Sequence, residues 1–271
     1  MRSSERLIAV FFIYAAIVAA WFFPPWKAWI MAAGVIAALG LLSRRKSLVR
    51  DFAPIVFTFA AYREMDWFTP VVRDGHLERA WILWDRRLLD GWHLRAALES
   101  GGALLPSYLE LCYFLVYAVA PAGIALLLLN RRRERVNTFW LVYLAGTLGA
   151  YALFPFFPSE PPWIAFAGAD LPNVVTFWRQ INLFIVGAVG IHSSVFPSAH
   201  VSSAFSAAWG LLATIPERRW IGWLMALYAI SVAIATVYGR YHYAVDAAAG
   251  AGISVAALAA LQLDRKSSAS F

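Results

Sequence analysis

The sequence predicts an all-α protein: a polytopic bundle of about eight transmembrane helices, with one amphipathic helix in the membrane interface. Its 271 residues are 61% hydrophobic and only 14% charged, whereas about a quarter of the residues of a soluble domain are charged. Aromatic residues make up 16% of the chain, which is typical of aromatic belts at two membrane interfaces. Apolar runs close to the roughly 20 residues that span a bilayer recur along the sequence.

Seven of these runs are long enough to cross a membrane, and an eighth is interrupted by charge. The seven cover residues 7–23, 26–42, 106–129, 136–157, 195–215, 219–240 and 243–263. The eighth, residues 52–68, carries Arg63, Glu64 and Asp66 near one end. Because basic clusters favour the cytoplasm, the clusters at 44–46 and 131–133 require two spans between them. We therefore count 52–68 as a span.

Eight spans place both termini in the cytoplasm. The loops then sort their basic residues by side, as the positive-inside rule requires. The residues predicted to lie inside are Arg2, Arg6, Arg44, Arg45, Lys46, Arg50, Arg131, Arg132, Arg133, Arg135, Arg218, Arg219, Arg265 and Lys266. The net charge of +7 is thus explained by membrane topology, and nucleic-acid binding is not expected.

The first two runs form a separate unit. Arg2 and Arg6 before residues 7–23 resemble a signal peptide, but no small-residue cleavage site follows, so we expect a retained anchor. The predicted domains are a two-span membrane anchor, residues 1–50, and a larger membrane domain, residues 51–271. Cys112 is the single cysteine, which excludes an intramolecular disulfide and a cysteine metal cluster.

Residues 69–105 form the one outer segment that mixes both charge signs. Within 77–99, apolar residues recur at helical spacing, which predicts an amphipathic helix in the interface plane; a small soluble cap is the alternative. The apolar positions are Leu77, Trp81, Trp84, Leu88 and Trp92. The later outer segment, 158–194, is expected to be a loop with few charges.

Small residues recur at every third or fourth position within two of the last three predicted spans. Ser203, Ala207 and Gly210 share one helix face, and small residues at such spacing let membrane helices approach closely. A second face of this kind is predicted from Ala244, Ala248 and Gly252.

The candidate site begins with the stretch 236–250, which places Arg240, His242 and Asp246 within seven residues. His242 and Asp246 are four apart, so on a helix they share a face. A carboxylate in this position fixes the imidazole tautomer and suits a histidine nucleophile or base. A structural pair or a pair of metal ligands remains the alternative.

The second part of the site is Ser193–His200. Pro197 is typical of a first helical turn, and Ser193 or Ser194 is a candidate cap. Free amides of such a turn bind anions, and Ser198 adds a hydroxyl donor. His200 is predicted at the same outer boundary as His242, which favours phosphoryl transfer.

Other readings of the two histidines remain open. Taken alone, His200 is better explained as an interfacial histidine, and its predicted position at the same boundary as His242 is what favours catalysis. A proton-linked transporter, in which His200, His242 and Asp246 form a relay, is the alternative of another class.

These motifs resemble a known family. Pro197-Ser-Ala-His200 and Tyr238-Gly-Arg-Tyr-His-Tyr-Ala-Val-Asp246 look like the second and third motifs of the type 2 phosphatidic-acid phosphatase superfamily. Phe157-Pro-Ser-Glu-Pro-Pro-Trp163 resembles the first motif of its inositol phosphorylceramide synthase branch. Weaker similarity at 84–91 and 54–64 extends the match over roughly residues 50–260.

The resemblance implies a six-helix phosphatase-like core and a metal-independent enzyme without a cofactor. His242 attacks phosphorus to give a phosphohistidine, Asp246 orients it, and His200 protonates the leaving oxygen and later deprotonates the acceptor. Ser198 and Ala199 are the expected phosphate-binding residues.

The sequence departs from the superfamily at three points. The first motif lacks its lysine and arginine, Thr236 stands where arginine is usual, and Ala199 replaces glycine. Arg240 is therefore the expected phosphate-binding cation, with Arg63 as a second candidate. For Arg63 the alternative is an ion pair with Glu64 or Asp66 at the interface.

We expect a membrane lipid carrying a phosphate or phosphodiester as substrate, reached from the outer leaflet beneath helix 77–99. A lipid alcohol or water is the acceptor. The alternative activity is a simple monoesterase acting on phosphatidic acid or a polyprenyl phosphate. The outer loop and the missing cations favour transfer from phosphodiesters. The sequence indicates no oligomeric state.

Overall fold

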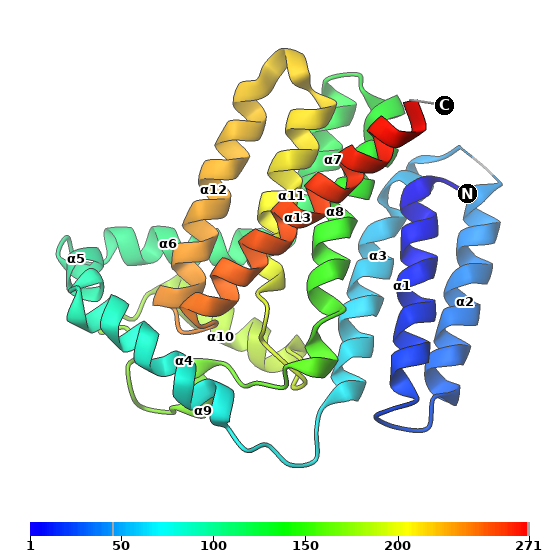
Figure 1. The fold of residues 1–271 in the computed structure, drawn as a ribbon. Coiled ribbons are helices and arrows are strands. Elements are labelled where there is room, and N and C mark those ends of the chain that lie inside the picture. The colour runs from blue at the N-terminus through cyan, green and yellow to red at the C-terminus, as the bar shows by residue number, and fades with distance from the viewer. Residues whose placement is uncertain (45, 270–271) are drawn as a thin grey trace.

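A computed structural model of the protein describes residues 1–44 and 46–269, with side chains as far as Gln262. Arg45 and the side chains of Arg265 and Lys266 lie outside this description. Every regular element in the described part is a helix (Figure 1). The α-helices are α1 Ser3–Ala19, α2 Trp26–Ser43, α3 Leu48–Met65, α4 His76–Arg86, α5 Leu94–Glu99, α6 Leu104–Leu115, α7 Val119–Leu129, α8 Val136–Tyr151, α9 Pro162–Ala165, α10 Phe177–Val189, α11 Ala199–Thr214, α12 Arg219–Tyr238 and α13 Ala244–Ala269.

Short helical turns join several of these helices. Their bounds are η1 Asp66–Phe68, η2 Arg87–Gly91 (a π-helix), η3 Val116–Ala118, η4 Arg133–Arg135, η5 Phe154–Phe156 and η6 Pro216–Arg218. The all-helical fold predicted from the sequence is confirmed for the described residues.

The helices that correspond to the predicted spans differ in length. Five segments are long and apolar enough to cross a membrane: Trp26–Ser43, Leu104–Leu129, Arg133–Phe156, Pro216–Tyr238 and Ala244–Gln262. Helices α1 and α11 are somewhat shorter, with 17 and 16 residues, and α3 carries charged residues near both ends. The chain is therefore an integral membrane protein, and the count of eight spans stays a prediction.

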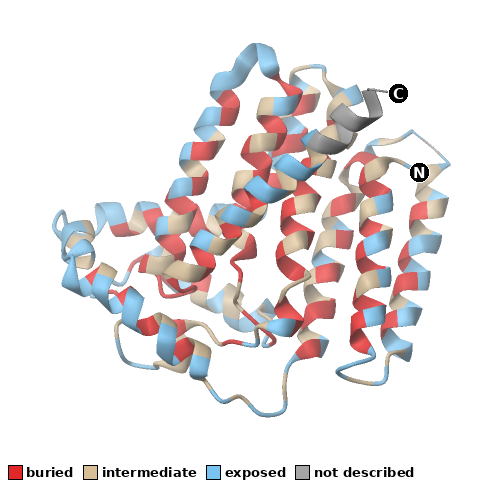
Figure 2. Cartoon of the chain, viewed as in Figure 1, coloured by how far each residue is buried: buried red, intermediate tan, exposed pale blue. Residues whose placement is uncertain are grey.

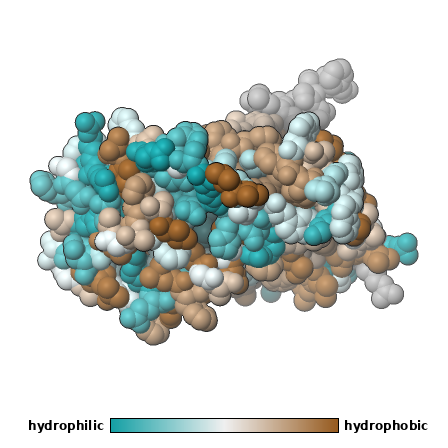
Figure 3. All heavy atoms as spheres, turned by 90° about the horizontal axis from the view of Figure 1, so that it is seen from below, coloured by the Kyte–Doolittle hydropathy of each residue, from teal (hydrophilic) through white to brown (hydrophobic). Residues whose placement is uncertain are grey.

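The connections sort to two opposite ends of the bundle. Both termini lie at one end together with the α2–α3, α7–α8 and α11–α12 turns (Figure 1), and these turns carry the basic residues. The other end holds α4, α9, α10 and the segments that contain the candidate site. Figure 3 views this end directly and shows hydrophilic residues gathered on it, with hydrophobic ones between them. That the end with the basic turns faces the cytoplasm remains a prediction.

The core lies where α8 and α11 pack together and against α12 and α13. Figure 2 shows buried positions along α8 and α11, whereas the outer face of α2 is exposed. Gly146 on α8 lies so close to α11 that an added Cβ would stand 2.0 Å from the Ser206 hydroxyl. Ser202 donates to the Gly146 carbonyl at 2.9 Å. Small residues thus bring these two helices into close contact.

The small-residue face predicted on α13 is wrong by one third of a turn. Ala248 and Gly252 are exposed, and a Cβ on Gly252 would meet nothing within 4 Å. The packed positions are instead Ala247, Gly250 and Ser254. A Cβ on Gly250 would stand 2.3 Å from the Ser198 carbonyl oxygen. Helical spacing alone allows either face of α13 to pack, and the contact with α11 selects the face that carries Gly250.

Two segments differ in form from the prediction. The predicted 106–129 span, which corresponds to the apolar segment Leu104–Leu129, contains the short turn η3, and α6 and α7 point in different directions (Figure 1). Residues 158–194, expected to be a loop, contain α9 and the 13-residue α10. Helix α10 buries Arg179 and Asn182 against the bundle, so its polar face points inward.

The N-terminal helices are joined to the rest of the bundle by a polar cluster at the basic end. The Arg50 Nε lies 2.6 Å from a Glu5 oxygen. Asp51 pairs with Arg2 at 2.8 Å and with Arg133 at 2.6 Å. Helix α1 also packs on α8. The predicted boundary after residue 50 thus falls within a contact-rich region; its status as a domain boundary stays a prediction.

Candidate active site

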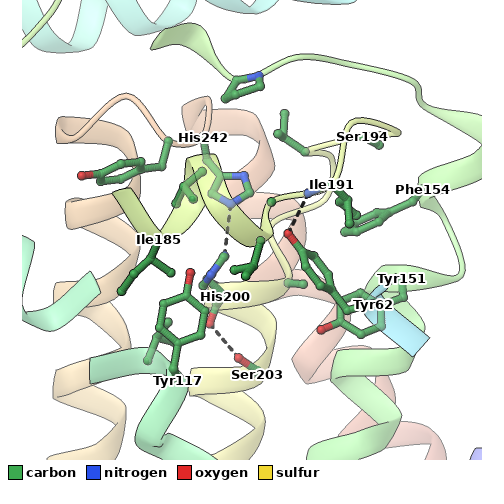
Figure 4. A pocket seen from close by; sticks show the side chains of 18 of the residues that line it. Tyr62, Tyr117, Tyr151, Phe154, Ile185, Ile191, Ser194, His200, Ser203 and His242 are labelled. Carbon is green, nitrogen blue, oxygen red and sulfur yellow. Dashed lines mark hydrogen bonds between the residues drawn. The ribbon is translucent and has the colours of Figure 1, made fainter. Parts of the chain in front are cut away.

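The structure brings His200, His242 and Asp246 together at the end of the bundle opposite the termini. His200 lies in the first turn of α11, His242 in the segment between α12 and α13, and Asp246 in the first turn of α13. The His242 Nε2 faces the His200 Nδ1 at 3.4 Å (Figure 4). The His242 Nδ1 lies 3.4 Å from the Asp246 Oδ2. With Asp246 ionised, Nδ1 carries the proton and Nε2 keeps its lone pair.

Backbone hydrogen bonds fix the segment that carries His242. The amides of Tyr241 and His242 both donate to the Thr236 carbonyl at 3.0 Å, and Arg240 has a left-handed φ of 65°. The Ser198 amide donates to the Asp246 carbonyl at 2.9 Å. This bond joins the start of α11 to the start of α13. The two histidine motifs, about forty residues apart in sequence, are thereby locked together.

Ser198 is the N-cap of α11, which corrects the predicted helix start. Its Oγ accepts from the Val201 amide at 3.4 Å, although the apolar run begins at residue 195. The hydroxyl of Ser194, one of the two predicted caps, instead donates to the Phe157 carbonyl and accepts from the Phe196 amide. Pro197 precedes the cap, so the helix begins one residue before His200.

Arg240 is held by a carboxylate that the sequence analysis did not assign to the site. The Arg240 Nη1 lies 2.6 Å from the Asp85 Oδ2, and both side chains are 1% exposed. The other Asp85 oxygen accepts from the Ala244 amide at 2.9 Å. Burial raises the pKa of Asp85, against the lowering effect of Arg240. Asp85 thus fixes both ends of the His242 segment.

Helix α4 packs on the protein through a face that carries two acidic residues, and the position of its apolar residues in the membrane interface stays a prediction. Trp84 and Trp92, on the predicted apolar face, are 63% and 65% exposed. The buried face carries Glu78 and Asp85 together with Ile82. The seven-residue spacing of the two acids marked this face in the sequence, because seven residues make nearly two helical turns.

A second buried network supports the His242 segment from the side of α6 and α10. Arg179 on α10 donates to Glu110 on α6 at 3.0 Å and to the Gly239 carbonyl at 2.9 Å. The Tyr241 hydroxyl donates to the other Glu110 oxygen at 2.7 Å. Tyr113 stacks on Tyr241 at a centroid distance of 4.0 Å. These groups were not predicted as site residues, because nothing in the sequence links residues so far apart.

The histidines lie on a cavity of about 620 Å³. Figure 4 shows His200 and His242 facing it, with Tyr62, Tyr117 and Ile185 around them. Its apolar part is lined by α3, α7 and α10. Helix α4 contributes none of the lining residues, and access of the substrate beneath helix 77–99 stays a prediction.

The remaining predicted residues lie around the cavity or outside it. Ala199 lines it, whereas Ser198, Asp246 and Arg240 are not among the residues of its wall. Arg63 donates to the carbonyls of Val189 and Gly190 and pairs with Asp66. Both arginines predicted to bind phosphate, Arg240 and Arg63, therefore form ion pairs with carboxylates of the protein.

Burial controls the protonation of His242, because it removes water from the ring and lowers the His242 pKa to about 4. The neutral imidazole suits a nucleophile. Among the described residues, no group of three His, Cys, Asp or Glu side chains is placed to hold a metal ion.

A family model described as the PAP2 superfamily matches residues 79–260, about two thirds of the chain. The match runs from α4 into α13 and includes both histidine motifs and Asp85. Neither the curated proteins nor the solved structures contain a match.

Proposed function

Since the chain belongs to the PAP2 superfamily of membrane phosphatases, we propose that it is a lipid phosphotransferase that uses a phosphohistidine intermediate. Its donor is a lipid phosphate or phosphodiester at the extracytoplasmic face, and its acceptor is a lipid alcohol or water. Within the superfamily, this activity resembles that of inositol phosphorylceramide synthase. The observation that carries the proposal is the His242–His200 contact beside an apolar cavity.

The geometry supports a two-step reaction. In the first step the His242 Nε2 attacks phosphorus, the bond to the leaving oxygen breaks, and His200 gives that oxygen a proton. In the second step His200 takes a proton from the acceptor, whose oxygen attacks phosphorus as the P–N bond breaks. Asp246 keeps the proton on the His242 Nδ1 throughout. Ser198 and Ala199 shape the turn that faces the phosphoryl group.

The composition of the cavity wall favours transfer to an alcohol over simple hydrolysis. Residues 159–164 and 185–195 supply much of the lining, so the outer segment forms a large part of the wall of the cavity that holds the histidines. Excluding bulk water is what a transferase needs to suppress hydrolysis.

The mechanism is tested with purified protein and a phospholipid labelled at phosphorus. His242→Ala should lower turnover by several orders of magnitude and incorporate no label. His200→Ala should slow both steps while keeping His242 as the histidine that can carry the label. Because the P–N bond of a phosphohistidine is labile in acid and stable in alkali, label on the protein is measured after quenching in alkaline detergent. Asp246→Asn should be impaired but less than His242→Ala. A folded His242→Ala protein with near-normal turnover would contradict the mechanism.

The acceptor is tested by supplying the same labelled lipid with and without ceramide or diacylglycerol. Transfer predicts a new labelled lipid whose formation depends on the added alcohol. If all label appears as inorganic phosphate at a rate indifferent to the alcohol, the protein is a monoesterase. Uptake by proteoliposomes without phosphate release would indicate the transporter instead.

A further inference from the structure

The charge on the cavity wall is confined to one place. Of the described residues that line the cavity, Arg73 is the sole arginine or lysine and Glu160 the sole carboxylate. The rest of the wall is apolar, aromatic or uncharged polar, apart from three histidines. The described wall of the cavity that holds His200 and His242 thus offers a ligand one permanent positive charge.

Arg73 reaches the cavity from the segment between η1 and α4. Its Nη1 lies 3.4 Å from a Glu160 oxygen, which is longer than the 2.7–2.9 Å typical of a charge-assisted hydrogen bond. Among the described residues this buried nitrogen has no hydrogen-bond partner. The Glu160 backbone is fixed independently, because its amide donates to Glu78 at 2.9 Å. Arg73 is thus held near a carboxylate that satisfies it poorly.

The other arginines near the site are held by shorter ion pairs, although the Arg240 Nη2 also has no hydrogen-bond partner among the described residues. Arg240 is 1% exposed and pairs with Asp85 at 2.6 Å. Arg179 pairs with Glu110 at 3.0 Å. Breaking either buried pair to bind a ligand would leave a carboxylate uncompensated. Arg73 is 18% exposed and Glu160 is 39% exposed, so water can solvate Glu160 when a ligand takes its place.

We propose that Arg73 binds the phosphate oxygens of the lipid substrate and that Glu160 is the weak counter-ion which the phosphate displaces. The planar guanidinium matches the geometry of two phosphate oxygens. This inference rests on the proposed function, and it gives the phosphate a cation in place of the first-motif lysine and arginine that the sequence lacks. The apolar wall from Phe59 on α3 to Pro121 on α7 holds the attached hydrocarbon chain.

The test compares four variants for KM, kcat and inhibition by inorganic phosphate. Arg73→Gln should raise KM and the inhibition constant for phosphate by about tenfold or more, with a smaller change in kcat. Arg73→Lys should recover part of the loss, because it keeps the charge but not the fork. Arg79→Gln, an exposed arginine on neighbouring α4 outside the cavity wall, should behave as wild type.

Glu160→Gln separates binding from a structural role. If Arg73 binds phosphate, Glu160→Gln removes the carboxylate that competes with the phosphate for Arg73. The KM should then stay unchanged or fall, whereas Arg73→Gln should raise it. If the pair merely holds two segments together, both variants should share one defect. That result, or an Arg73→Gln protein with wild-type KM and phosphate inhibition, overturns the inference. A wild-type protein that turns over no lipid phosphate would overturn the proposed function instead.

Discussion

Replacing Asp85 with Asn should impair both stability and turnover. Asp85 is 1% exposed and accepts from Arg240 at 2.6 Å and from the Ala244 amide at 2.9 Å. Asn keeps an oxygen for the amide but leaves the Arg240 charge without its partner. Removing one partner of a buried pair costs about 3–5 kcal/mol, and we expect the lower end of this range. Since a 1 Å displacement can cost about 100-fold in rate, a shifted His242 segment should lower kcat by a similar factor.

The assay combines thermal unfolding in detergent with lipid-phosphate turnover. Asp90→Asn is the matched control, because Asp90 follows on the same segment but is 49% exposed and pairs with Arg95 on the surface. It should change neither quantity appreciably. A double variant, Asp85→Leu with Arg240→Met, should be more stable than Asp85→Asn, since no charge is left buried. An Asp85→Asn protein with wild-type Tm and kcat would refute the assignment of Asp85 as a positioning residue.

Further predictions concern packing, pH, topology and metals. Gly250→Ala should destabilise the protein by about 1–3 kcal/mol, because its Cβ meets the carbonyl oxygen at the α11 N-cap; Gly252→Ala, which faces open space, should not. Because burial lowers the pKa of His242 to about 4 in the folded protein, His242 binds a proton at a higher pH in the unfolded chain than in the folded one. Stability should therefore be full above about pH 6.5 and decline by roughly 3 kcal/mol towards pH 4, less steeply in His242→Gln. A cysteine at Asn173 should react with an impermeant thiol reagent added outside intact cells, whereas one replacing Arg132 should not. Turnover should survive strong chelators, and loss restored by a divalent ion would contradict the metal-independent mechanism.

The parts of the fold that were predicted correctly depend on local sequence. Apolar runs placed the helices, and Arg44 and Arg131 correctly marked turns that share one end of the bundle with both termini. Errors arose where a tertiary contact decides between equal local choices. On α13, helical spacing could not distinguish the face of Gly250 from that of Gly252. On α10, the inward-facing Arg179 has no local signature, because its partner Glu110 lies 69 residues earlier.

The same distinction applies to the candidate site. His242 and Asp246 lie on one helical turn, so their proximity follows from sequence spacing, and the Pro-Ser-Ala-His motif identified His200. Which cation faces the cavity does not follow from spacing. Arg240 lies two residues from His242, yet its guanidinium points to α4 and pairs with Asp85. Arg73 is far from both histidines in sequence and nevertheless lines their cavity.

The ion pairs around the His242 segment have a positioning role. This segment is short, contains a left-handed residue at Arg240, and must hold His242 against His200 between two membrane helices. Asp85 anchors it from α4, and Arg179 and Tyr241 anchor it through Glu110 from the opposite side. Buried pairs add little net stability but resist rearrangement, because breaking one leaves a charge in an apolar medium. Arg73 is the exception: its looser pairing leaves its charge available to a phosphate.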